Sequence, residues 1–177
     1  LCSATLPMVN PDGGGHSMRL GDHGWKANGA AEMRQTFLVS PANTGFSYSY
    51  AVVLQDPDDH TDAQRPYFAV AMYDEGGNEI DCGIYNVISG PGRPGFKDDM
   101  DTWGQICHRY KDWTTVFVPL GAYVGQNVTV VFRTGDCEKG AHYGYAYIDA
   151  NCEKMELLAV RDNGDCNSAN ATITAPA

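Results

Sequence analysis

The sequence predicts an all-β fold, an antiparallel β-sandwich of about nine strands. Apolar and polar residues alternate with a period of two over several short runs, which is typical of strands that bury one face. Turns rich in Gly, Pro and Asp separate these runs. No window carries the 3.6-residue apolar stripe of a helix. Many short strands with turns between them indicate two packed sheets.

The clearest strand covers residues 46–54, where Phe46, Tyr48 and Tyr50 share one side of the pleat. Residues 67–72 and 79–85 are expected to pair as a hairpin around the turn at residues 74–78. Further strands are expected over residues 17–20, 32–39 and 155–160. The segment 86–112 shows no stable periodicity, which predicts a long loop.

Residues 113–152 carry three more strand-like runs. Val128, Val130 and Phe132 share one side of a pleat, and Tyr143 and Tyr145 begin a second such row. We expect one domain, with an irregular entry segment at residues 1–15, the sandwich module at 16–160 and a linker or tail at 161–177. The first residues resemble no signal peptide, so we expect a mature or excised piece of a longer protein.

Charge and hydropathy exclude several partners. A net charge of −10 argues against nucleic acid and anionic membranes, because both require Lys and Arg to neutralise phosphates. No apolar run approaches the roughly 20 residues that span a bilayer, so no membrane insertion is expected. An acidic surface suits an extracellular domain.

Six cysteines without a CxxC pair favour disulfides in an oxidising compartment over a zinc cluster. We hypothesise that Cys137 pairs with Cys152, because the two bracket one strand. Three pairs would form in all, and six cysteines allow about 15 connectivities. The other two hypothesised pairs are Cys82 with Cys107 and Cys2 with Cys166. A zinc interpretation of Cys137 with His142 lacks a second close pair and is set aside.

The order of motifs HSMRLGD, QTFLVSP, FSYSYAVVLQDPDDH and GDCEKGAHYGYAYIDANC resembles a known class of module. It is similar to the jelly-roll β-sandwich modules of secreted and cell-surface proteins from Bacteroidetes-type bacteria. Those modules are distantly similar to MAM domains and to galactose-binding-like carbohydrate-binding modules. The resemblance implies an extracellular or cell-surface location, flanking domains in a larger surface protein, and a non-catalytic role.

The same resemblance implies a structural calcium ion. Such modules commonly hold calcium with an acidic residue on a late strand and an early loop, and Asp149 and Asp22 match those positions. Calcium takes hard oxygen ligands, which carboxylates supply. The acidic loop at residues 56–62 lacks EF-hand spacing and is interpreted as solvated.

Aromatic residues carry the carbohydrate hypothesis, because flat rings suit the C–H faces of pyranose sugars. Trp103 lies in a polar stretch and is the best exposed platform. His108, Arg109 and Tyr143 are the accompanying ligand candidates, with Arg109 able to hold an acidic sugar by two hydrogen bonds. Binding of carbohydrate or a cell-surface glycan, or adhesion, is therefore the predicted function.

Two other functions stay open. A jelly-roll polysaccharide lyase or hydrolase could use Tyr143, His142, Arg133 and His108, although no catalytic motif singles them out. The chain could also be a structural repeat or filament subunit that contacts only its neighbours.

Overall fold

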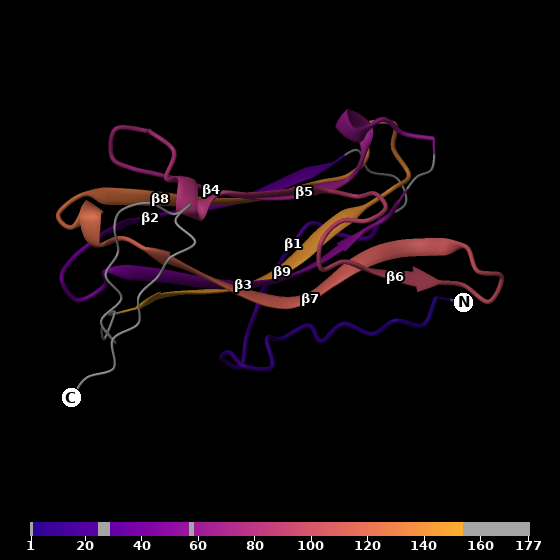
Figure 1. Cartoon of the computed structure of the whole chain (residues 1–177), viewed down its shortest axis with the longest axis horizontal. Helices are drawn as coiled ribbons and strands as arrows, with labels where there is room; N and C mark the ends of the chain where they lie inside the picture. The colour runs from indigo at the N-terminus through magenta and orange to yellow at the C-terminus, as the bar shows by residue number, and fades with distance from the viewer. Residues whose placement is uncertain (1, 25–28, 57–58, 154–177) are drawn as a thin grey trace.

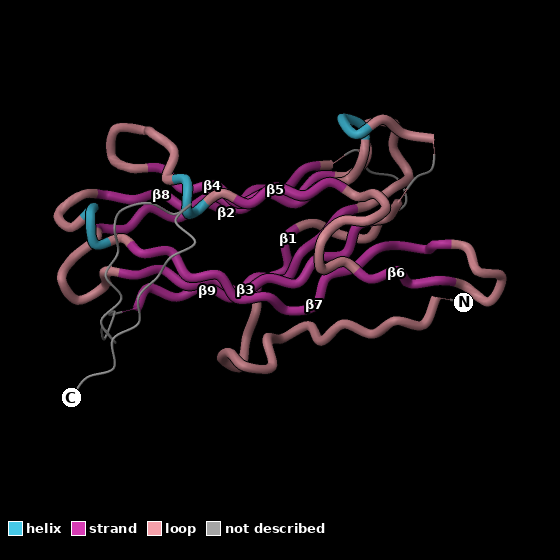
Figure 2. Tube along the Cα trace, viewed as in Figure 1, coloured by secondary structure: helices cyan, strands magenta, loops and turns pink. Residues whose placement is uncertain are grey.

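The protein folds as two antiparallel β-sheets packed face to face, as Figures 1 and 2 show. The computed structural model describes residues 2–24, 29–56 and 59–153. The predicted strand at 155–160 and the predicted tail lie outside these ranges. None of the helices in the described ranges has the length and apolar character that a membrane span requires.

One sheet has five strands in the order β1-β9-β3-β7-β6, and the other has four in the order β2-β8-β4-β5. The strands of the first sheet are β1 (Met18–Leu20), β9 (Gly144–Glu153), β3 (Gly45–Leu54), β7 (Ile106–Pro119) and β6 (Lys97–Met100). Those of the second are β2 (Ala30–Leu38), β8 (Asn127–Gly135), β4 (Tyr67–Tyr73) and β5 (Tyr85–Ile88). The predicted all-β sandwich is thereby confirmed.

The core lies between the sheets, where the alternation predicted it. Tyr48 and Tyr50 point inward from β3, and Phe132 from β8 meets the Tyr48 ring edge-on with centroids 5.4 Å apart. Phe68 stacks on Tyr50 at 5.2 Å. Burial raises the pKa of Tyr48 to about 12, so its phenol stays neutral inside the sandwich.

Two element predictions are wrong. Residues 79–85 are not one strand, because Asp81–Gly83 forms a 3₁₀ helix and the strand β5 begins only at Tyr85. The segment 86–112 is not an irregular loop, since it contains β6 and the first residues of β7. β6 and β7 pair as a hairpin at the edge of the five-stranded sheet.

The N-terminal segment crosses the outer face of the five-stranded sheet, below β3 and β7 in Figure 1. This cover explains why β3 is buried on both faces. Val53 points away from the core, yet it is buried beside Leu6 of the segment and Tyr145 of β9. The Trp113 indole Nε1 donates a hydrogen bond to the Pro7 carbonyl at 2.9 Å, which fixes the segment midway.

Candidate functional site

Trp103 lies at the tip of the β6–β7 hairpin, and 84% of its surface is exposed. The tip is well ordered by Asp101, whose Oδ1 accepts the backbone N–H groups of Trp103 and Gln105, both at 2.9 Å. Gly104 has a φ of 79°, a conformation that favours glycine. The hairpin therefore presents the indole on a preorganised turn.

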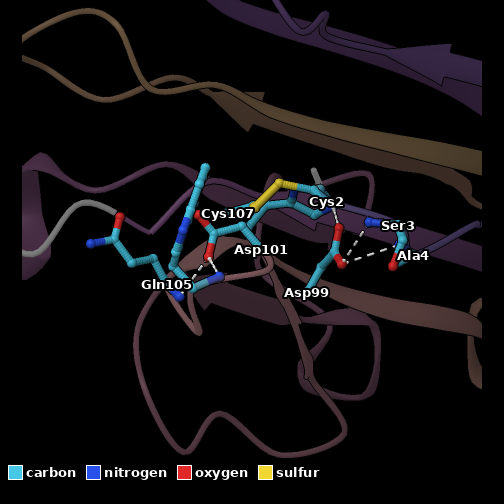
Figure 3. Close-up of a disulfide and its surroundings, with 9 residues drawn as sticks. Cys2, Ser3, Ala4, Asp99, Asp101, Gln105 and Cys107 are labelled. Carbon is cyan, nitrogen blue, oxygen red and sulfur yellow. Dashed lines mark hydrogen bonds and ion pairs between the residues drawn. A yellow bond between two sulfur atoms is a disulfide. The ribbon is translucent and has the colours of Figure 1, made fainter.

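A disulfide between Cys2 and Cys107 anchors this hairpin to the N-terminal segment, as Figure 3 shows. Beside it, the Asp99 carboxylate accepts the backbone N–H groups of Ser3 and Ala4 at 3.2 and 3.1 Å. The hairpin is thus fixed next to its tip, covalently and by charge-assisted hydrogen bonds.

His108 and Tyr143 are two of the predicted sugar ligands, and the charge of Asp99 acts on both. His108 Nε2 is 3.1 Å from Asp99 Oδ2. Burial lowers the pKa of His108, although the Asp99 charge opposes this shift. Burial raises the pKa of the Tyr143 phenol, and Asp99 adds to that rise. Both side chains are only partly accessible to a ligand.

Arg109, another predicted sugar ligand, is buried, whereas Trp103 is exposed. Its guanidinium turns inward, where Nε donates to Asp56 Oδ2 at 2.7 Å and a second nitrogen pairs with Asp98. Asp56 also pairs with Arg65, so one buried carboxylate joins two arginines. The structure gives Arg109 the role of joining the β3–β4 loop to the hairpin.

Asp149 and Asp22, the predicted calcium pair, are not brought together. Asp149 lies on the outer face of β9 against the N-terminal segment, where Asn10 Nδ2 donates to its Oδ2 at 3.4 Å. Asp22 follows β1 at the opposite end of β9, near Asp136 and Gly144. Burial raises the pKa of Asp136, and the Asp22 charge adds to that rise.

The hypothesised disulfide connectivity is wrong. Cys2 pairs with Cys107, which rules out the pairs Cys82–Cys107 and Cys2–Cys166. Cys82 is disulfide-bonded as well, whereas Cys166 lies outside the described residues. Cys137 and Cys152 are free thiols. Cys137 precedes β9 and Cys152 lies near the far end of this strand, so about eight strand residues at roughly 3.3 Å each separate them. A disulfide needs Cα atoms within about 7 Å.

Cys137 instead lies in a group with His60 and His142 that sequence reasoning missed. The Cys137–His142 pair was visible in the sequence, but His60 comes from a loop 77 positions earlier, and no spacing rule links the two.

The residues of the alternative lyase do not lie together. Arg133 lies on the four-stranded sheet, bonded to Glu32, while His108 belongs to the other sheet.

A cavity of about 630 Å³ opens between β1 and β2, and its lining includes Met33, Phe37 and Phe132. None of the four predicted sugar ligands lines it.

No protein-family model and no curated protein matches this sequence. The fold and the site geometry define a disulfide-containing β-sandwich. Its function has to be inferred from its own residues.

Proposed function

We propose that the protein is a non-catalytic extracellular recognition module that binds carbohydrate through Trp103. The observation that supports this function best is the fully presented indole on a turn that is ordered before any ligand arrives. A rigid aromatic side chain loses little entropy on binding and offers a flat apolar face to a sugar ring. The disulfide next to the hairpin tip is consistent with an oxidising, extracellular location.

The strand order supports the jelly-roll form of the sandwich. Setting β6 aside as an added edge strand leaves β1-β9-β3-β7 facing β2-β8-β4-β5. The strands β1, β2, β3 and β4 alternate between the two sheets, and β5 then pairs with β4 in the same sheet, as expected of the double-sheet jelly roll. This is the architecture that the resemblance to cell-surface modules implies, and flanking domains of a larger surface protein accompany it there.

Replacing Trp103 by Ala is expected to abolish binding to the glycans or polysaccharides that the unmodified protein retains. Its exposed side chain contributes little packing, so the free energy of unfolding should change by less than about 0.5 kcal/mol. A glycan array and a pull-down with insoluble polysaccharides measure the binding. Phe117→Ala is the matched control, because Phe117 is an exposed aromatic on β7 beyond the part that pairs with β6.

Unchanged binding by Trp103→Ala would exclude the indole as the platform. Release of soluble sugar fragments would favour the lyase or hydrolase instead. Self-association without any glycan binding would favour the structural repeat or filament subunit.

We also propose a structural calcium ion at Asp149, with residues of the N-terminal segment in place of Asp22. A concave site of about 400 Å³ surrounds this carboxylate, and its lining is rich in oxygen donors that suit calcium. A Cβ atom on Gly13 would lie 2.1 Å from Asp149 Oδ2, so glycine is needed here. Asn10, Asp12, Ser49 and Thr115 contribute to the same lining.

Removal of calcium with EGTA is expected to lower the melting temperature, and added calcium should restore it. At a concentration about 100 times the dissociation constant, a bound ion stabilises a fold by about 2.7 kcal/mol. Asp149→Asn should lose this response, whereas Asp22→Asn should retain it. A melting temperature that is indifferent to EGTA and calcium would count against the ion.

A further inference from the structure

The group formed by His60, Cys137 and His142 lies at one end of the sandwich, away from Asp149. His60 belongs to the connection between β3 and β4. Cys137 and His142 both belong to the connection between β8 and β9. Two loops that are distant in sequence therefore supply one thiol and two imidazoles to the same place.

Backbone hydrogen bonds hold these loops in position. The Cys137 N–H donates to the His142 carbonyl at 2.9 Å, which closes a tight turn. The Glu138 N–H donates to the Gln64 carbonyl at 3.0 Å and joins this turn to the loop of His60. Lys139 Nζ adds a bond to the Asp59 carbonyl at 3.1 Å. These hydrogen bonds fix the two loops relative to each other and bring their side chains together.

The three donor atoms are close enough to share one ligand. Cys137 Sγ lies 3.3 Å from His142 Nδ1, and one ligand atom from each residue lies within 4.8 Å of the others. The His60 and His142 rings meet edge-on with centroids 4.9 Å apart. In a tetrahedral zinc site with Zn–S near 2.3 Å and Zn–N near 2.0 Å, neighbouring ligand atoms are about 3.5 Å apart. A small contraction would bring this group to that geometry.

The surroundings of His60 give a second observation, independent of the distances between the three side chains. The residue is only 8% exposed, and its Nε2 is buried without a hydrogen-bond partner. Leaving a buried polar atom unpaired costs free energy, so such an atom requires an explanation. Its other nitrogen, Nδ1, lies 2.7 Å from Asp59 Oδ1. A carboxylate on the far nitrogen is the arrangement that orients metal-bound histidines.

We propose that His60 Nε2, Cys137 Sγ and His142 Nδ1 bind one zinc-class transition-metal ion. A thiolate with two imidazoles suits zinc and its spectroscopic substitute cobalt, whereas calcium and magnesium take oxygen ligands. The Cys137 side chain is completely buried, so an ion would be held among loops that exclude most water. The site is independent of the proposed sugar recognition and of the proposed calcium at Asp149.

The free thiol itself fits this assignment. Cys137 donates to the Gly140 carbonyl at 2.8 Å while its sulfur faces His142. On binding, the thiol loses its proton to solvent and the thiolate becomes the metal ligand. In an oxidising compartment, coordination would also protect a cysteine that has no disulfide partner in the described structure.

The test uses the full chain, freed of metal and then supplied with Zn²⁺ or Co²⁺ alone. We expect one equivalent of Zn²⁺ after gel filtration and, with Co²⁺, a thiolate-to-cobalt charge-transfer band. Cys137→Ser should lose the band and the bound zinc. Cys152→Ser, which removes a free thiol at the far end of β9, should retain both. Asp59→Asn is expected to weaken zinc binding about 10–100-fold.

His60→Gln guards against a variant that fails to fold, because His60 Nε2 makes no hydrogen bond and the Nδ1 bond that is lost goes to the exposed Asp59 carboxylate. This variant should keep the circular dichroism of the metal-free protein and should still lose stoichiometric zinc. An excess of Ca²⁺ should not displace the cobalt band. Substoichiometric zinc in the unmodified protein, or equal zinc binding by Cys137→Ser or His60→Gln, would overturn the assignment.

Discussion

Replacing Arg109 by Met is expected to lower the free energy of unfolding by about 3–5 kcal/mol, the usual cost of breaking a buried ion pair from one side. The reason is Asp56, whose side chain is only 4% exposed and which receives hydrogen bonds from both Arg109 and Arg65. Without Arg109, one Asp56 oxygen remains buried and loses its partner. Asp98 also loses its contact, which releases the hairpin from the β3–β4 loop.

Urea unfolding followed by tryptophan fluorescence measures this loss. Arg133→Met is the matched control, because Arg133 bonds Glu32 at 2.7 Å with both side chains about 40% exposed. Exposed pairs contribute about 0–1 kcal/mol. Equal destabilisation by the two substitutions would show that the buried network around Asp56 contributes no more than a surface pair.

The fold was predictable where one face of a strand is apolar. Residues 46–54 and 128–133 alternate cleanly, and both became core strands. β6 has the sequence KDDM and offers no such signal. It exists because its register places Asp98 opposite Arg109 and Asp99 opposite His108 on β7. Charge pairing between strands therefore replaced the hydrophobic pattern on which the sequence argument depends.

The site was less predictable than the fold, because function depends on which face each residue occupies. Trp103 and Arg109 are close in sequence, and both were assigned to a sugar site. The strand places Arg109 on the inward face, while the hairpin tip exposes Trp103. The His60 group could not be inferred at all, since only the folded chain brings its loop to Cys137.

Cysteine pairing shows the same limit. Cys137 and Cys152 flank a strand, and that position alone favoured a bridge. An extended strand separates its two ends, so flanking cysteines are the pair that cannot meet. Cys2 and Cys107 are 105 residues apart in sequence, yet the N-terminal segment brings them together across the sheet.

Removing that bridge with Cys2→Ser and Cys107→Ser together is expected to lower the free energy of unfolding by about 4 kcal/mol. A disulfide stabilises chiefly by restricting the unfolded chain, and a loop of about 100 residues corresponds to about 4.7 kcal/mol in the chain-entropy model. The Asp99 hydrogen bonds to the Ser3 and Ala4 N–H groups would then be the remaining link at this end of the segment. Urea unfolding under oxidising conditions measures the difference.

A reductant would not isolate this effect, because Cys82 is disulfide-bonded as well. The variant therefore serves better than dithiothreitol, with Cys152→Ser as the control for loss of a cysteine outside any bridge. Release of the N-terminal segment should also uncover the outer face of β3. Faster amide hydrogen exchange at residues 3–6 and 8, with unchanged exchange in β8, would locate the release at this segment. An unfolding midpoint equal to that of the unmodified protein would show that hydrogen bonds alone hold the segment in place.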